Sequence, residues 1–179
     1  MIDPVSMRQF LYPLVFAGVG LAFLFVRLLP VGSLVGGFPG PDVMLCLAFA
    51  WVQRRPDYLP PLLLVAVFLT LDLMLLRPPG LWTALVLLGA EFLRSRRQLS
   101  AEMPFGVEWA LVGVVLVMIT LLEALILSLT AVHHPGIGQA LMQTVSTLAA
   151  YPVIVFVSKF GLGVRRPTPD EANRRRPPR

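Results

Sequence analysis

Apolar and polar residues follow one another along this chain in blocks, with long apolar runs separated by short segments that carry Arg, Pro and Gly. A helix needs about 20 mostly apolar residues to cross the hydrocarbon core of a bilayer, because each residue advances it by about 1.5 Å. The pattern therefore predicts an all-α membrane protein, with six transmembrane helices in a compact bundle formed by residues 1–163. The predicted spans cover residues 10–30, 36–53, 59–76, 79–93, 105–130 and 137–160.

The second predicted span is the weakest of the six. Its continuous apolar run, from Val43 to Val52, has only 10 residues. It crosses the membrane only if the helix begins within the preceding Gly/Pro-rich segment, GSLVGGFPGPD, or if the bilayer is thinner around it.

The C-terminal residues 164–179 are rich in Pro and Arg and contain almost nothing to bury. Such a composition cannot form a packed core. We therefore expect a disordered basic tail on the cytoplasmic side.

The composition supports lipid as the solvent of this chain. Of its 179 residues, 56% are hydrophobic and 14% are charged, whereas about a quarter of a soluble domain is charged. The net charge is +5, but the basic residues lie beside apolar runs and are not interleaved with aromatic residues that could stack on bases. We therefore expect membrane lipids, and no nucleic acid, as partners.

The positions of the basic residues predict the topology. With six spans, all of the 15 Lys and Arg residues except Arg27 and Arg77 fall on one side of the membrane. The positive-inside rule assigns that side to the cytoplasm. This predicts a multi-pass protein of the bacterial inner membrane with both termini in the cytoplasm, and it supports the second span, without which two arginines would lie outside. The expected cytoplasmic anchors are Arg54, Arg55, Arg94, Arg96 and Arg97.

No catalytic or metal-binding motif is visible in the sequence. It has no phosphate-binding loop and no HEXXH motif. The only two histidines, His133 and His134, are adjacent in an expected outer turn, and the single cysteine, Cys46, lies inside an apolar run. We predict that the protein is not an enzyme and has no catalytic residues, no metal and no cofactor.

Charged residues inside the predicted spans are the most informative polar positions. A charge in lipid is costly, so each is expected to face protein or water. Arg27 shares its depth with Asp42, Asp72 and Glu123, so we hypothesise that it pairs with one of them. Two interpretations stay open: ion pairs that fix the order of the helices, or a small ligand site between them. The candidate intramembrane polar contacts are Arg27, Asp42, Asp72, Glu91 and Glu123.

Four short motifs between Phe38 and Arg97 carry a family resemblance. They are Pro41-Asp42 at the opening of the second span, Leu71-Asp72-Leu73 at the end of the third, the turn Pro79-Gly80-Leu81, and Glu91-Phe92-Leu93-Arg94-Ser95-Arg96 at the end of the fourth. With these motifs and its six-span layout, the chain resembles the rod shape-determining protein MreD family.

The resemblance implies a non-catalytic membrane subunit of the bacterial cell-wall elongation complex. Such a subunit maintains rod shape by binding the bitopic protein MreC through its transmembrane helix and coupling it to MreB and the RodA–penicillin-binding-protein machinery. The family fold is similar to the substrate-binding component of energy-coupling-factor transporters. A small-molecule, vitamin-like carrier or transporter substrate-binding subunit is therefore the alternative. A membrane enzyme acting on lipid-linked substrates near Glu91, Arg94 and Arg96 is a third, weaker interpretation.

Overall fold

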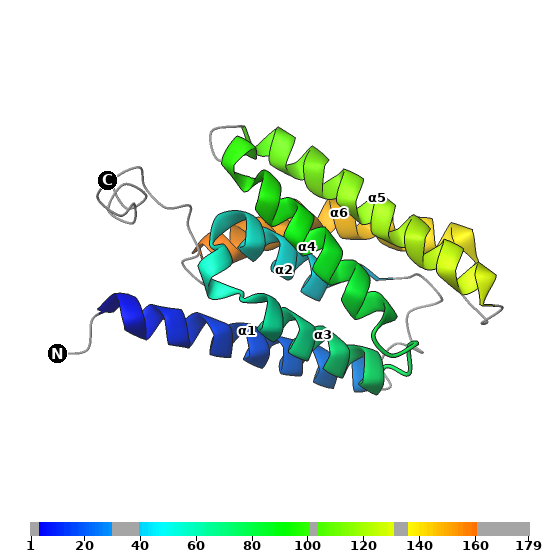
Figure 1. Cartoon of the computed structure of the whole chain (residues 1–179), viewed down its shortest axis with the longest axis horizontal. Coiled ribbons are helices and arrows are strands. Elements are labelled where there is room, and N and C mark those ends of the chain that lie inside the picture. The colour runs from blue at the N-terminus through cyan, green and yellow to red at the C-terminus, as the bar shows by residue number, and fades with distance from the viewer. Residues whose placement is uncertain (1–3, 30–39, 101–103, 131–135, 161–179) are drawn as a thin grey trace.

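The computed structural model describes residues 4–29, 40–100, 104–130 and 136–160, and these residues are all-α (Figure 1). The prediction of six helices is confirmed. The helices are α1 (Pro4–Leu28), α2 (Val43–Arg54), α3 (Pro61–Met74), α4 (Leu81–Ser100), α5 (Phe105–Leu129) and α6 (Ile137–Phe160), with the short 3-10 helix η2 (Pro56–Tyr58) between α2 and α3. The predicted tail and the turn that holds His133 and His134 lie outside the described residues.

Three of the helices are long and apolar enough to cross a membrane, judged by length and composition. Their apolar parts are Leu11–Leu28 of α1, Phe105–Leu129 of α5 and Gly138–Phe160 of α6. The apolar helices α2 and α3 are shorter, with 12 and 14 residues.

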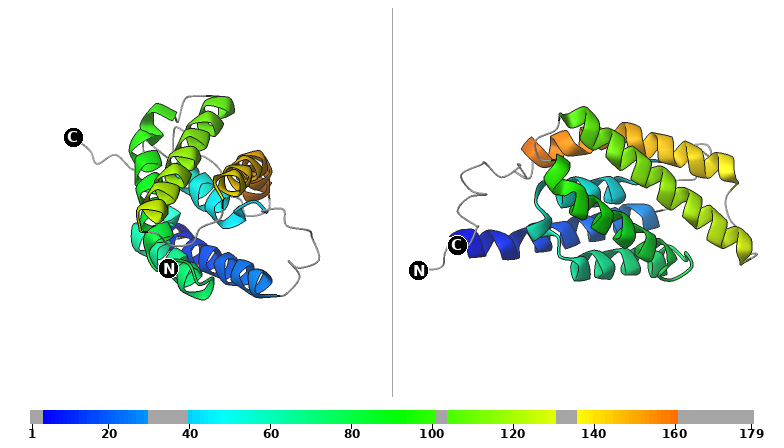
Figure 2. Two further views of the ribbon diagram at one scale, coloured as in Figure 1. Left: turned by 90° about the vertical axis from the view of Figure 1, so that its right-hand side faces the viewer. Right: turned by 45° about the horizontal axis from the view of Figure 1, so that its top comes forward.

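Helix α2 lies at the centre of the bundle. It packs against α6 and α4, and Figure 2 shows it enclosed between them. All of its residues from Met44 to Arg54 are buried. At about 1.5 Å per residue, its 12 residues extend over only about 18 Å. Because protein surrounds it, α2 does not need the long apolar surface that a helix in contact with lipid requires.

The start of α2 differs from the predicted span of residues 36–53. The helix begins at Val43 because Asp42 is its N-cap, with the carboxylate accepting a hydrogen bond of 3.0 Å from the backbone N–H of Leu45. A carboxylate at this position satisfies a free N–H group and interacts favourably with the positive end of the helix dipole.

The α3–α4 turn is held by a second carboxylate. Asp72, near the end of α3, is fully buried and accepts hydrogen bonds from the backbone N–H and the hydroxyl of Thr83, at 3.0 Å and 2.7 Å. Gly80 lies between them with a φ of +83°, a conformation that favours glycine. Asp72 therefore caps the N-terminus of α4 from across the turn.

Helix α4 continues past the predicted limit of the fourth span at residue 93. It runs to Ser100, because the arginines that follow Leu93 are good helix formers and do not end the helix.

Two glycines allow close contact between helices. A Cβ atom on Gly89 of α4 would lie 2.9 Å from Cγ1 of Val115 in α5 and 3.1 Å from Cζ of Phe49 in α2. A Cβ atom on Gly20 of α1 would lie 2.9 Å from Cγ1 of Val67 in α3. Helix α1 is the least covered of these elements, and much of its apolar surface faces outward.

Candidate functional site

Polar side chains gather at the two ends of the bundle. We call these the Asp42 end, where α3 meets α4, and the Arg54 end, where α2, α4 and α6 finish. In Figure 1 the Asp42 end is on the right and the Arg54 end is on the left.

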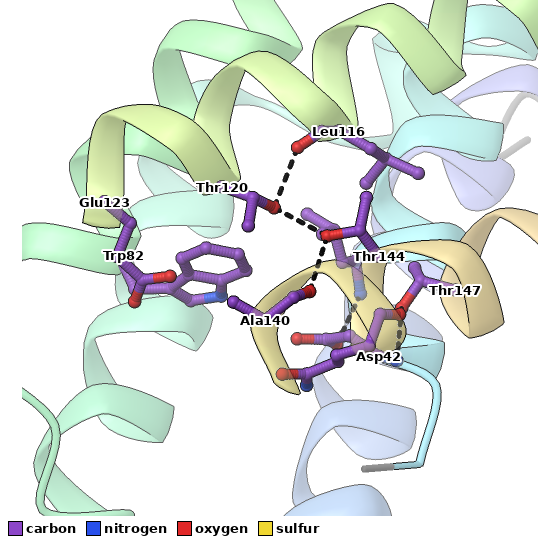
Figure 3. A pocket seen from close by; sticks show the side chains of 10 residues that line it. Asp42, Trp82, Leu116, Thr120, Glu123, Ala140, Thr144 and Thr147 are labelled. Carbon is purple, nitrogen blue, oxygen red and sulfur yellow. Dashed lines mark hydrogen bonds between the residues drawn. The ribbon is translucent and has the colours of Figure 1, made fainter. Parts of the chain in front are cut away.

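A small polar cavity lies at the Asp42 end, between α2, α4, α5 and α6 (Figure 3). We call it the threonine pocket. Its volume is about 30 Å³, which is room for about two water molecules. Its lining residues are Asp42, Leu45, Trp82, Leu116, Thr120, Glu123, Ala140, Gln143, Thr144 and Thr147.

The threonine hydroxyls of this pocket bond to their own helices. Thr144 Oγ1 lies 2.9 Å from the carbonyl of Ala140, and Thr147 Oγ1 donates to the carbonyl of Gln143 at 2.7 Å. Thr147 also accepts a hydrogen bond of 3.0 Å from the backbone N–H of Asp42. This contact ties the start of α2 to the middle of α6.

Cys46, in the first turn of α2, also bonds to Thr147 of α6. It is buried, and its thiol donates to the carbonyl of Thr147 at 3.2 Å. Together with the bond between Asp42 and Thr147, this contact fixes the first turn of α2 against α6.

Glu123 and Trp82 also line the threonine pocket, but unlike the threonine hydroxyls their polar groups form no hydrogen bonds within the described residues. Figure 3 shows the carboxylate of Glu123 beside the indole ring of Trp82. Within the described residues, no hydrogen bond or ion pair reaches the carboxylate of Glu123. The indole N–H of Trp82 is buried and also has no partner in the structure. Arg77 acts electrostatically on Glu123, but its guanidinium lies over the Trp82 ring, 5.5 Å from the centroid.

The hypothesised ion pair of Arg27 is not formed in the part of the chain that the structure describes. Arg27 Nη2 makes a long hydrogen bond of 3.5 Å to the carbonyl of Pro41, and its guanidinium lies 5.1 Å from the Phe23 ring centroid. Asp42 and Asp72 instead cap α2 and α4. These two carboxylates accept hydrogen bonds from helix N-termini. The ion-pair hypothesis used only membrane depth and charge sign, so it did not consider helix capping.

A buried cluster at the Arg54 end joins three helices. Arg54 Nη2 of α2 lies 3.6 Å from Oε1 of Glu108 in α5, and the hydroxyl of Tyr151 in α6 donates to the same oxygen at 2.9 Å. All three residues are buried. Arg54, predicted as a cytoplasmic anchor, is therefore buried against protein, because α2 is central and its last turn is covered by other helices.

Glu108 and Tyr151 are functional candidates that the sequence prediction missed. The sequence signal that could have indicated Glu108 is its position at the start of the fifth span, at the predicted depth of the Arg54-Arg55 pair. Nothing in the sequence indicates that the Tyr151 hydroxyl reaches the same carboxylate.

The other predicted anchors whose side chains the structure describes lie on or near the surface. Arg94 forms an ion pair of 3.0 Å with Glu91 and donates to the carbonyl of Leu59 at 2.8 Å, which joins α4 to the α2–α3 connection. Arg55 lies over the Tyr58 ring and Arg96 over the Phe92 ring. The side chain of Arg97 lies outside the described residues.

An apolar groove of about 220 Å³ runs between α1 and α3 on the outer surface of the bundle. Several of its residues are small, so another apolar chain can approach the backbone closely here. We call it the α1–α3 groove, and it is lined by Ala17, Gly20, Leu21, Leu24, Leu63, Ala66, Val67, Thr70 and Leu71.

Among the residues that the structure describes, no three or more His, Cys, Asp or Glu side chains are placed to hold a metal ion. The fold and these clusters define an all-α, multi-pass membrane protein. No family model, no curated protein and no solved structure matches this chain.

Proposed function

We propose that this protein is a non-catalytic membrane subunit of the bacterial cell-wall elongation complex, of the MreD type. It maintains rod shape by binding the transmembrane helix of an MreC-like bitopic protein and coupling it to MreB and the RodA–penicillin-binding-protein machinery. The observation that carries the proposal is the resemblance of four short sequence motifs to those of that family. Two of these motifs contain Asp42 and Asp72, which cap α2 and α4.

The proposal includes six membrane crossings in the bacterial inner membrane, with both termini in the cytoplasm. It is supported by Arg55, which directly follows α2, and by Arg94 of α4, which bonds to the carbonyl of Leu59 just after α2 and η2, so that both arginines lie near the α2–α3 connection. Cationic side chains at one end of a bundle favour contact with anionic lipid headgroups on the cytoplasmic side.

The α1–α3 groove is the proposed docking surface for the partner helix. Helices in lipid associate by close van der Waals packing, since burying apolar surface against protein gains little over burying it in lipid. Ala66 is exposed in this groove and Gly20 lies at the contact with α3.

The experiment fills the groove with a bulky side chain. Ala66→Trp places an indole in the groove without disturbing the buried core, so we expect recovery of the MreC-like protein in detergent co-purification to fall at least about tenfold. Cells that carry only this variant should become round. Val153→Trp is the matched control, because Val153 is an exposed residue of α6 away from the groove.

Two results would count against the proposal. One is normal rod shape after deletion of the gene in a rod-shaped host that has no second copy. The other is equal loss of the partner in Ala66→Trp and Val153→Trp, which would show that the groove is not the docking surface.

The carrier alternative needs a cavity for an organic molecule. The threonine pocket has a volume of about 30 Å³, whereas small-molecule sites usually have about 300–1,000 Å³. The threonine pocket is therefore too small for a vitamin-like molecule, which disfavours the carrier alternative at this site.

A further inference from the structure

A small cavity at the Asp42 end lies beside the α1–α3 groove, and we call it the arginine pocket. Its lining includes Arg27 from the last turn of α1, Arg77 from the α3–α4 turn and Trp82 from the first turn of α4. Leu71 lines both the arginine pocket and the groove, and Leu24 of the groove is one helical turn before Arg27. A helix that lies in the groove therefore meets the arginine pocket where it leaves the bundle.

The two arginines of this pocket form no ion pair within the described residues. Arg27 makes only the long hydrogen bond to the Pro41 carbonyl and lies over an aromatic ring. Arg77 lies over the Trp82 ring. A guanidinium carries five N–H donors, so both groups retain donors for a further partner. Residues 30–39, which follow α1 in the sequence, contain no Asp or Glu that could be this partner.

The carboxylates that the chain itself places at this end are already compensated. Asp42 and Asp72 accept hydrogen bonds from the N-termini of α2 and α4, and the positive ends of these helix dipoles offset their charge. Arg77 acts electrostatically on Glu123. Arg27 is therefore the cation in excess at the Asp42 end, and a counter-charge for it has to come from another molecule.

An orphaned donor in the same pocket indicates that this molecule brings an oxygen acceptor. The indole N–H of Trp82 is buried and has no partner in the structure, which is rare in native proteins. The volume of the arginine pocket is about 10 Å³, which is room for about one water-sized group. A carboxylate oxygen on a flexible side chain has this size, whereas a phosphate group with its four oxygens is larger.

We propose that the arginine pocket binds the carboxylate of an Asp or Glu side chain on the partner helix, placed where that helix leaves the α1–α3 groove at the Asp42 end. One carboxylate oxygen accepts the hydrogen bond of Trp82, and the guanidinium of Arg27 pairs with the carboxylate as a charge-assisted donor. The inference rests on the proposed docking in the groove and adds the chemistry that recognises the partner. A charge pair at one end of an apolar groove fixes the register and the direction of the docked helix.

The experiment titrates the purified MreC-like protein against this protein in detergent and measures the dissociation constant. The transmembrane helix of that partner should carry an Asp or Glu near its non-cytoplasmic end. Arg27→Glu places a like charge opposite this residue, so the affinity should fall at least about tenfold. Lys159→Glu is the matched control, because it reverses an exposed charge in the last turn of α6 at the Arg54 end. It should change the affinity by less than about twofold.

A reciprocal substitution tests the pairing directly. Replacing the acidic residue of the partner by Arg should weaken binding to the wild type by a similar factor. Combining it with Arg27→Glu should restore the affinity to within about threefold of the original pair, because the two charges are exchanged. Arg27 is exposed at the end of α1, so Arg27→Glu should fold and should unfold within about 2 °C of the wild type.

Three results would overturn the inference. The first is loss of binding in Ala66→Trp with normal binding in Arg27→Glu, which would leave docking in the groove intact. The second is a partner helix without an acidic residue near that end. The third is normal partner affinity in Arg27→Glu together with loss of phospholipid that co-purifies with the wild type, measured as bound phosphate, which would make the pocket a lipid headgroup site. Failure of the wild type to bind the MreC-like protein would remove the proposed function and this inference together.

Discussion

The hydrogen bond between Tyr151 and Glu108 gives a quantitative test of the helix arrangement. The hydroxyl of Tyr151, which is fully buried, donates to the Glu108 carboxylate at 2.9 Å. Tyr151→Phe removes this oxygen alone, leaves the ring in place and creates almost no cavity. No bulk water reaches Glu108, which is 1% exposed, to replace the lost donor.

The expected loss of stability is about 1–2 kcal/mol. Hydrogen bonds to charged groups contribute about 1.5–3 kcal/mol in soluble proteins, but polar interactions between membrane helices average only about 0.6 kcal/mol, with a maximum near 1.7 kcal/mol. The charged acceptor places Tyr151→Phe toward the upper part of the membrane range. For a chain of this size, about 1 kcal/mol corresponds to roughly 2–4 °C, so the unfolding midpoint should fall by about 2–8 °C.

The assay follows thermal unfolding of the full-length protein in detergent with a fluorogenic thiol reagent, which reacts with Cys46 as the protein unfolds because Cys46 is the only cysteine and is 1% exposed. Tyr12→Phe is the matched control. Tyr12 stacks on Tyr58 at a centroid distance of 4.2 Å, so its ring should matter more than its hydroxyl. Tyr12→Phe should change the midpoint by less than about 2 °C. A double-mutant cycle with Glu108→Leu should show that Tyr151→Phe has little further effect once the acceptor is gone. Equal midpoints for wild type and Tyr151→Phe would refute the reasoning.

Two further predictions concern the core. Arg54→Leu should lower stability by about 3 kcal/mol or more, because it leaves the buried Glu108 without the guanidinium that lies 3.6 Å away. Arg96→Leu, at an exposed position, should change stability by less than about 0.5 kcal/mol. Similar losses of stability in the two variants would contradict the burial of Arg54. Gly89→Ala should lower stability by about 1–3 kcal/mol, because its new methyl group would meet Val115 at 2.9 Å. Gly18→Ala, with nothing within 4 Å of the new methyl group, should be neutral or slightly stabilising. Thermal unfolding scans of the two variants side by side test this contrast.

The sequence by itself determined the six α-helices of the described residues and where most of them lie. An apolar run involves only residues that are consecutive in the chain, so its length can be read from the sequence. Proline, glycine and arginine residues mark the connections between runs. The predicted sixth span, residues 137–160, has the bounds of α6. The Pro-Gly turn, Pro79-Gly80, directly precedes the start of α4 at Leu81.

The tertiary structure alone decided which polar residues meet. Hydropathy is the same for a helix surface that faces lipid and one that faces protein, so the sequence could not indicate that α2 is central and Arg54 buried. It also could not indicate that Tyr151 reaches Glu108, or that Trp82 and Glu123 share a pocket with three threonines. These contacts join residues far apart in the chain, and they depend on how the helices are ordered and rotated, which the spacing within each helix does not specify.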